Sequence, residues 1–95
     1  MRVVGRLILE RFVEAHVDVG SAVDAWLAEA TFANWRTPAD IKARYASASF
    51  LAGNGVVFNL KGNKYRLDTQ VAYQTGVVLV RRIGTHAEYE RWSFD

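Results

Sequence analysis

The chain has 95 residues, of which 51% are hydrophobic and 13% aromatic, and we expect a single domain over residues 1–95. It contains no cysteine and only two histidines, which excludes disulfides and thiolate metal sites and argues against structural zinc. The formal net charge of +2 permits binding to nucleic acid without demanding it. The N-terminus lacks a long apolar segment, and no apolar run approaches the roughly 18 residues of a membrane span, so we expect a soluble, cytoplasmic, non-secreted protein.

The first part of the chain is predicted to be a short strand followed by two helices. Residues 1–4 suit the strand, and apolar side chains recur at helical spacing in residues 6–16. His16 ends that helix, where we expect it to be a solvated residue without a functional role. Asp18 and Ser21 are suitable N-caps for the second helix, which carries its own apolar stripe.

A third, short helix is predicted to begin at a Thr-Pro-Ala-Asp segment. Thr37 is a suitable N-cap, Pro38 fits the first turn, and Asp40 lies where the helix dipole favours negative charge. We expect this helix to reach about Tyr45. A connection of small residues and a short strand over residues 49–52 are predicted to follow it.

The next segment is predicted to be a β-hairpin over residues 56–67. Two runs of alternating apolar and polar residues flank a Gly-Asn pair, which we expect to form a two-residue turn with positive φ. The resulting register places four polar side chains on the face away from the apolar ones, with Asn59 opposite Arg66 and Lys61 opposite Lys64. Like charges opposite each other are unfavourable. The lysine pair therefore indicates either an anionic partner or a merely solubilised hairpin tip.

Two longer strands, up to about Tyr73 and over residues 77–83, are predicted to complete the sheet. The continuous apolar run of the last strand is typical of a central strand covered on both faces. Helices come first along the chain and strands afterwards. This order predicts an α+β fold with the N-terminal helices packed on one face of a small antiparallel sheet, followed by a short C-terminal helical turn.

The length of the last turn decides which arginine shares a face with Arg66. A two- or four-residue connection places Arg81 there, whereas a three-residue loop with a bulge at Gly76 places Arg82 there, opposite Asp68. The residues alone leave both alternatives open.

The residues after the last strand could carry acid–base chemistry. Thr85 can cap a short helical turn on which His86 and Tyr89, three residues apart, point the same way. Imidazole accepts and donates protons near neutral pH, and Arg66 and Arg81 could grip a phosphate. These groups suffice for metal-free RNA cleavage, in which charge grows on the phosphate oxygens. The alternative is a structural histidine at a strand end among ordinary surface charges.

Two segments carry a resemblance to a known family. Lys-Gly-Asn-Lys-Tyr-Arg at residues 61–66 and Gly-Thr-His-Ala-Glu-Tyr at residues 84–89, with the stretch at 35–43, resemble the HigB-type toxins of type II toxin–antitoxin systems. The resemblance implies a RelE-like mRNA interferase that cuts mRNA, typically on the translating ribosome, without a metal or other cofactor. It also implies a cognate antitoxin, usually a helix-turn-helix, HigA-like protein, through which alone operator DNA would be contacted. No membrane partner is expected.

The resemblance also implies which side chains act. By motif position the catalytic residues would be Arg66, Arg81, His86 and Tyr89, and the RNA-binding residues Lys61, Lys64 and Asn59, with no metal ligand. It favours Arg81 over Arg82 as the active-face arginine. The chain departs from the family pattern at Asp68 and Arg82, which replace usually apolar residues and could pair with each other. It also departs in its aromatic C-terminal tail and at Glu90, where Asp is more usual.

Two other functions compete with an endoribonuclease. A non-catalytic RNA- or ribosome-binding regulator could use the same scaffold, because a fold does not fix an activity. A protein-interaction module could instead use the helical region that carries Trp26 and Trp35. The co-occurrence of arginines, a histidine and a tyrosine favours the nuclease, since a simple binder has no need of His86.

Overall fold

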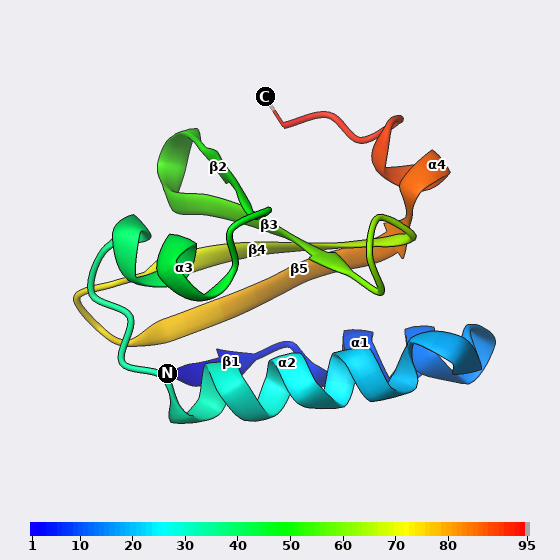
Figure 1. Ribbon diagram of the computed structural model, residues 1–95, viewed down its shortest axis with the longest axis horizontal. Coiled ribbons are helices and arrows are strands. Elements are labelled where there is room, and N and C mark those ends of the chain that lie inside the picture. Colours follow the sequence, from blue (N-terminus) through cyan, green and yellow to red (C-terminus); the bar gives the residue numbers. More distant parts are fainter. Residues whose placement is uncertain (95) are drawn as a thin grey trace.

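The computed structural model describes residues 1–94 and consists of a five-stranded sheet with α1 and α2 against one of its faces (Figure 1). The helices and strands follow one another as β1 (Arg2–Val4), α1 (Arg6–Ala15), η1 (Val17–Val19, a 3₁₀ turn), α2 (Gly20–Phe32), α3 (Pro38–Arg44), β2 (Ser49–Leu51), η2 (Ala52–Asn54, a 3₁₀ turn), β3 (Gly55–Leu60), β4 (Tyr65–Ala72), β5 (Val77–Thr85) and α4 (His86–Tyr89).

The sheet has the strand order β1-β5-β4-β3-β2. Its pairs are antiparallel except for β1, which lies parallel to β5. The α+β fold with a short C-terminal helix is thus confirmed, and the sheet is antiparallel apart from its first strand. Parallel pairing of β1 is possible because the whole chain between β1 and β5 serves as the long connection that parallel strands need.

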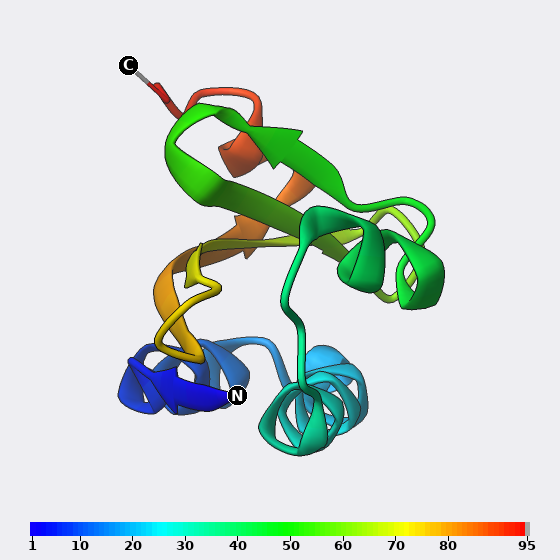
Figure 2. The same ribbon diagram turned by 90° about the vertical axis from the view of Figure 1, so that its left-hand side faces the viewer.

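Helices α1 and α2 lie side by side on one side of the sheet, as Figure 2 shows. The core between them and the sheet is aromatic: Trp26 and Phe58 are almost fully buried, with ring centroids 5.4 Å apart. Trp35 stacks on the same phenylalanine, with ring centroids 6.0 Å apart, and only 6% of it is exposed. Both tryptophans therefore belong to the core, which removes the basis for an interaction module built on them.

The start of α3 is as predicted. Thr37 Oγ1 accepts a hydrogen bond from the Asp40 N–H at 3.4 Å, and Asp40 Oδ2 accepts from the backbone N–H groups of Arg36 and Thr37 at 2.9 and 3.1 Å. These two backbone N–H groups lower the pKa of Asp40, and the N–H of Arg36 has the larger effect. The capping box is decided by neighbours in sequence, which explains why the pattern was readable.

The predicted caps of α2 are wrong. The 3₁₀ turn η1 runs directly into α2, whose N-cap is Val19 and makes no side-chain hydrogen bond. Asp18 points instead to the β3–β4 hairpin, where three side chains donate to it. The competing donors come from a segment far along the chain, so the sequence pattern alone could not show them.

The β3–β4 register is as predicted, with Asn59 paired with Arg66 and Phe58 paired with Leu67. The connection differs in its backbone. Positive φ occurs at Lys61 (51°) and Gly62 (66°), and the Lys64 N–H donates to the Lys61 carbonyl at 3.3 Å. The two lysines therefore close the turn instead of forming a rung of the ladder.

The β4–β5 register contains a bulge that neither predicted alternative describes fully. A four-residue connection pairs Ala72 with Val77, but farther along Thr69 pairs with Val80 and Asp68 with Arg82. Arg81 is the extra residue, so the bulge does not lie at Gly76. Both Arg81 and Arg82 then reach Asp68, on the face that also carries Arg66.

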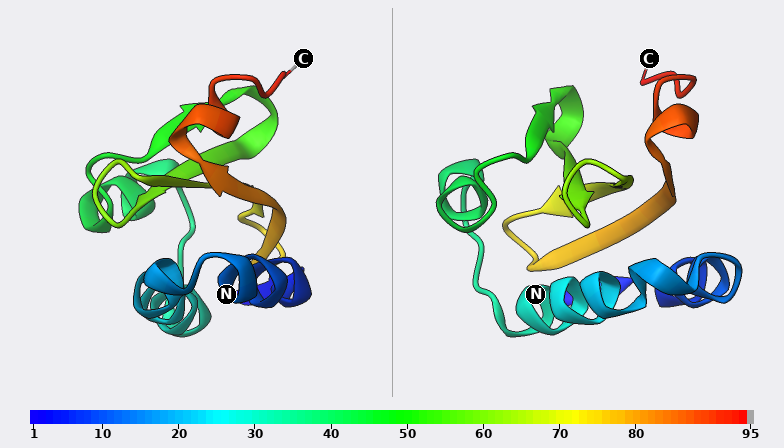
Figure 3. Two further views of the ribbon diagram at one scale, coloured as in Figure 1. Left: turned by 90° about the vertical axis from the view of Figure 1, so that its right-hand side faces the viewer. Right: turned by 45° about the vertical axis from the view of Figure 1, so that its right-hand side comes forward.

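The last strand is only partly covered, contrary to expectation. Val78 and Val80 are buried beneath the helices, whereas Leu79 between them is 39% exposed on the other face. Within residues 1–94, α4 and the segment that follows it lie on this side of the sheet, opposite α1 and α2 (Figure 3).

Candidate active site

The turn α4 is fixed at the end of β5 by a capping box. Thr85 Oγ1 accepts from the Glu88 N–H at 3.2 Å, and Glu88 Oε1 accepts from the Thr85 N–H at 2.9 Å. The second bond is the main reason that the pKa of Glu88 is lowered. The His86 N–H also donates to the Lys64 carbonyl at 3.0 Å, which joins the turn to the β3–β4 hairpin. The predicted cap at Thr85 is confirmed.

His86 and Tyr89 lie on the same side of this turn, as their spacing predicted. Their ring centroids are 6.4 Å apart. His86 Nε2 lies 2.9 Å from Glu90 Oε1, and half of the imidazole side chain is exposed (50%). The carboxylate can orient the ring through one nitrogen while the other faces away from that contact.

Arg66 joins these two residues from the neighbouring strand. It is only 8% exposed, and its Nη1 donates to the Asn63 carbonyl at 2.7 Å. Its guanidinium carbon lies 5.2 Å from the centroid of the Tyr89 ring. A cation held against an aromatic face in this way is oriented without needing a carboxylate. The structure therefore brings Arg66, His86 and Tyr89 together.

Gly84 makes room for the segment that follows α4. A Cβ atom at this position would lie 2.8 Å from Trp92 Cζ2 and 3.2 Å from Glu88 Cβ. Trp92 can pack directly on the strand because the position is glycine. Its ring lies 5.7 Å from that of Tyr89, nearly edge to face at 82°. Apart from the aromatic character of the tail, nothing in the sequence indicated this contact.

Asp68 binds both arginines of the bulge. Its Oδ1 accepts from Arg81 Nη2 at 3.0 Å and its Oδ2 accepts from Arg82 Nε at 2.9 Å. Asp68 is 1% exposed, and the two arginine side chains are 37% and 36% exposed. The pairing of Asp68 with Arg82 was foreseen as possible, but the part of Arg81 in it was not.

Lys61 and Lys64 do not join Arg66. Their Nζ atoms lie 3.2 and 2.7 Å from Asp18 Oδ2, at the junction of α1 and α2. The Tyr65 hydroxyl donates to Asp18 Oδ1 at 2.7 Å. The bonds from Lys64 and then Tyr65 are the largest reasons why the pKa of Asp18 is far below its usual range. The hairpin tip is therefore turned toward the helices.

Asn59, the remaining predicted RNA contact, pairs with Arg66 but is directed toward the other edge of the sheet. Its Nδ2 donates to the Ser47 carbonyl at 3.2 Å, in the connection before β2. It therefore has a structural partner of its own.

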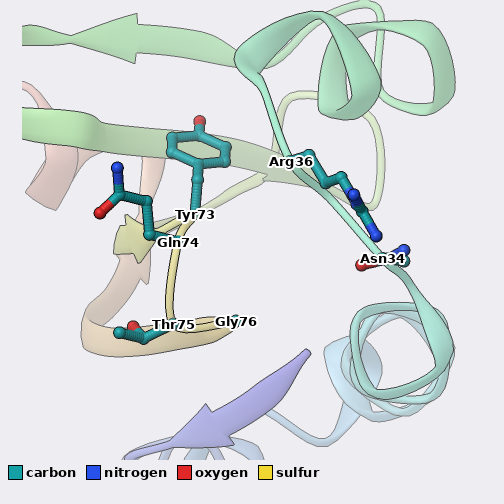
Figure 4. A pocket seen from close by; sticks show the side chains of 6 residues that line it. All are labelled: Asn34, Arg36, Tyr73, Gln74, Thr75 and Gly76. Carbon is teal, nitrogen blue, oxygen red and sulfur yellow. The ribbon is translucent and has the colours of Figure 1, made fainter.

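A hollow lies at the other end of the β4–β5 hairpin, between its turn and the α2–α3 connection (Figure 4). Its volume is about 500 Å³, and burial raises the pKa of Tyr73 in its wall. The lining residues are Asn34, Arg36, Tyr73, Gln74, Thr75 and Gly76. None of the predicted site residues belongs to it.

Two further observations concern residues 1–94 only. Nowhere in this range do three or more His, Asp or Glu side chains gather closely enough to hold a metal ion. None of the helices in the same range combines the length and apolar character that crossing a bilayer requires.

Comparison with known protein families identifies a match. A family model described as HigB_toxin, the RelE-like toxic component of a toxin-antitoxin system, matches residues 19–92. This range contains every predicted site residue. Among curated proteins, none is similar enough to count as a match.

Proposed function

The chain belongs to the HigB family of RelE-like toxic components of toxin–antitoxin systems, and from this premise we propose that it is an endoribonuclease that cleaves mRNA. Membership in a toxin family implies a cognate antitoxin. The observation that supports a nuclease best is the convergence of three side chains. His86 and Tyr89 share one capped turn, and the Arg66 guanidinium lies against the Tyr89 ring.

The proposed reaction is attack of a ribose 2′-hydroxyl on the adjacent phosphorus, with departure of the 5′-oxygen. Negative charge grows on the phosphate oxygens as the new bond forms, and Arg66 and Arg81 stabilise that charge. Arg66 suits this role because, within residues 1–94, its guanidinium contacts backbone carbonyls and a ring instead of a carboxylate. Arg81 shares Asp68 with Arg82 and retains a partly exposed side chain.

His86 is the proposed proton-transfer residue, because imidazole donates and accepts protons near neutral pH. Glu90 contacts its Nε2, which leaves Nδ1 for the substrate. We assign it as the acid that protonates the leaving 5′-oxygen, while the proton of the attacking 2′-hydroxyl passes to solvent water. The alternative is that His86 takes this proton as the base. Tyr89 orients or stacks on the scissile nucleotide. No metal ion takes part in this scheme, so EDTA is expected to leave the rate unchanged.

The proposed setting is the translating ribosome. Inhibition would come from the antitoxin, proposed to be a helix-turn-helix, HigA-like protein that also binds the operator DNA. A non-catalytic regulator on the same scaffold is the competing function. It requires the basic groups but gives no role to the proton chemistry of His86.

The experiment is single-turnover cleavage of programmed ribosomes across pH, with EDTA kept below the Mg²⁺ concentration, so that it removes transition-metal ions while the ribosomes stay assembled. The proteins are the wild type, His86→Gln, Tyr89→Phe and the control His16→Gln, which changes the histidine stacked on Phe12. We expect His86→Gln to slow cleavage roughly 10²–10⁴-fold and to flatten one limb of the pH profile. The control is expected to keep a near-normal rate.

Other outcomes have definite meanings. Normal cleavage by His86→Gln together with an inactive Tyr89→Phe would make Tyr89 the catalytic group. Arrest of bacterial growth by the wild type, without new mRNA ends in primer extension, would favour the non-catalytic regulator.

A further inference from the structure

A small hollow adjoins the candidate active site on the open face of the sheet. The C-terminal segment turns back from α4 toward β2 (Figure 1), and residues of this segment and of β2 line the hollow. Its volume is about 110 Å³. That is roughly the space of three or four water molecules, which suits one flat ring and excludes a nucleic-acid duplex. The lining residues are Leu51, Ala52, Arg81, Arg82, Ser93 and Phe94.

Phe94 supplies an aromatic wall that is held in place. The Arg82 guanidinium carbon lies 5.0 Å from the centroid of its ring, and Arg82 Nη2 donates to the neighbouring Ser93 carbonyl at 3.1 Å. Arg82 is fixed in turn by buried Asp68. Phe94 nevertheless remains 38% exposed. A rigid, solvent-facing aromatic ring beside cations is the arrangement on which unpaired bases stack.

Arg81 supplies a cation in the same hollow. One of its nitrogens binds Asp68 and its side chain is 37% exposed, so donors remain for a phosphate oxygen. Gly55 keeps space beside it. A Cβ atom there would lie 3.5 Å from Arg81 Nη2 and 3.2 Å from Leu51 Cβ, although its φ of −71° is open to any residue. Gly55 is therefore suited to this position because it lacks a side chain, and not because of its backbone conformation.

Phe94, in the wall of the hollow, lies next to the candidate catalytic residue Tyr89. The Phe94 ring lies 6.1 Å from that of Tyr89, inclined at 60°. A nucleotide whose base contacts Phe94 therefore has a neighbour within reach of Tyr89. Asp68, which binds both arginines that line the hollow, is shared between them and does not leave an unpaired negative charge.

We infer that this hollow receives the base of one unpaired nucleotide of the RNA strand next to the cleaved bond, stacked on Phe94, while a phosphate outside the hollow contacts the exposed part of Arg81. This inference rests on the proposed ribonuclease function and adds a substrate contact to it. The aromatic tail thereby becomes part of the substrate-binding surface. Base preference at one position flanking the cut is set there.

The probe is a 2′-O-methyl RNA, which lacks the attacking hydroxyl, with 2-aminopurine placed in turn at each position, both free and on programmed ribosomes. We expect the fluorescence of one position to change on binding wild-type protein. Phe94→Ala is expected to abolish that change and to weaken binding roughly 5- to 150-fold, the equivalent of losing one base stack. Phe94→Tyr should restore both. Phe32→Ala, which removes a 90% exposed phenylalanine on α2, should match the wild type.

An unchanged fluorescence signal and affinity in Phe94→Ala would overturn the inference. Adenosine 5′-monophosphate serves as a competitor. If adenosine 5′-monophosphate competes only far above the RNA concentration, the hollow is a site for an RNA strand, as inferred. If it binds as tightly as the RNA does, the hollow is a site for free nucleotides and the inference is overturned. A Phe94-dependent signal from a protein that never cleaves RNA would reject the proposed nuclease but keep the hollow. A protein that cleaves RNA without the Phe94-dependent signal would keep the proposed nuclease and reject the nucleotide site in the hollow.

Discussion

Asp18 and Asp68 each hold two basic side chains, but their surroundings differ. The Asp18 side chain is 36% exposed, and its partners Lys61 and Lys64 are 46% and 59% exposed. The Asp68 side chain is 1% exposed beneath two arginines. Water can replace the partners of Asp18 easily, whereas a buried carboxylate depends on its partners.

The difference in exposure separates cations that can bind a substrate from cations that maintain the fold. The lysines of the Asp18 cluster can exchange their carboxylate for a phosphate at little cost. Arg82 cannot do so, since it also holds the C-terminal segment through Ser93. Arg66 differs from both groups, because within residues 1–94 its guanidinium contacts two backbone carbonyls and the Tyr89 ring.

Within this comparison the largest expected effect concerns Arg66, a cation that belongs to neither cluster. Arg66→Ala is expected to slow cleavage roughly 10²–10³-fold, as does the loss of other oriented groups that stabilise transition-state charge. The far-ultraviolet circular dichroism should remain that of the folded protein. Arg36→Ala, at the opposite end of the sheet, is the matched control. Near-normal cleavage by folded Arg66→Ala would remove Arg66 from the mechanism.

The next effect compares how much each of the two aspartates contributes to the free energy of unfolding. Asp68→Ala is expected to lower the free energy of unfolding by roughly 2–3 kcal/mol, less than for a fully buried pair because the arginines are partly exposed. Asp18→Ala should cost clearly less. Urea unfolding followed by tryptophan fluorescence measures both. Equal losses would show that exposure does not distinguish the two clusters.

A smaller effect concerns binding. Lys61→Ala and Lys64→Ala are each expected to reduce the slope of log affinity against log salt by about 0.7 for single-stranded RNA. Arg82→Ala should leave that slope unchanged, since Arg82 is held by Asp68 and by the Ser93 carbonyl. Affinity measured between about 50 and 200 mM salt tests this. A lower slope in Arg82→Ala would place Arg82 among the RNA-binding cations.

The smallest effect is the pH dependence contributed by Asp18. Its pKa is lowered in the folded protein, so it binds a proton more readily when unfolded and stabilises the fold at neutral pH. This contribution falls as the pH drops below about 5, through its ordinary pKa near 3.9 and toward the folded value. The stability difference between wild type and Asp18→Asn should therefore shrink on acidification. A difference that stays constant from pH 7 to pH 3 would contradict the proposed ion pairs.

Local patterns in the sequence determined a large part of this structure. The capping boxes at Thr37 and Thr85 and the pairing of Asn59 with Arg66 were all readable. Each depends on residues a few positions apart or on the alternation of one hairpin. The shared side of His86 and Tyr89 follows from helical spacing in the same way. The roles of these residues stay predictions.

Tertiary structure decided the rest. The bulge that brings both Arg81 and Arg82 to Asp68, the capture of the hairpin lysines by Asp18 and the packing of Trp92 on Gly84 were not readable. Lys61 and Asp18 are separated by 43 positions in the chain, and no short-range period relates them. Such contacts form because folded elements bring charges and rings within a few ångströms, where burial makes some of them obligatory.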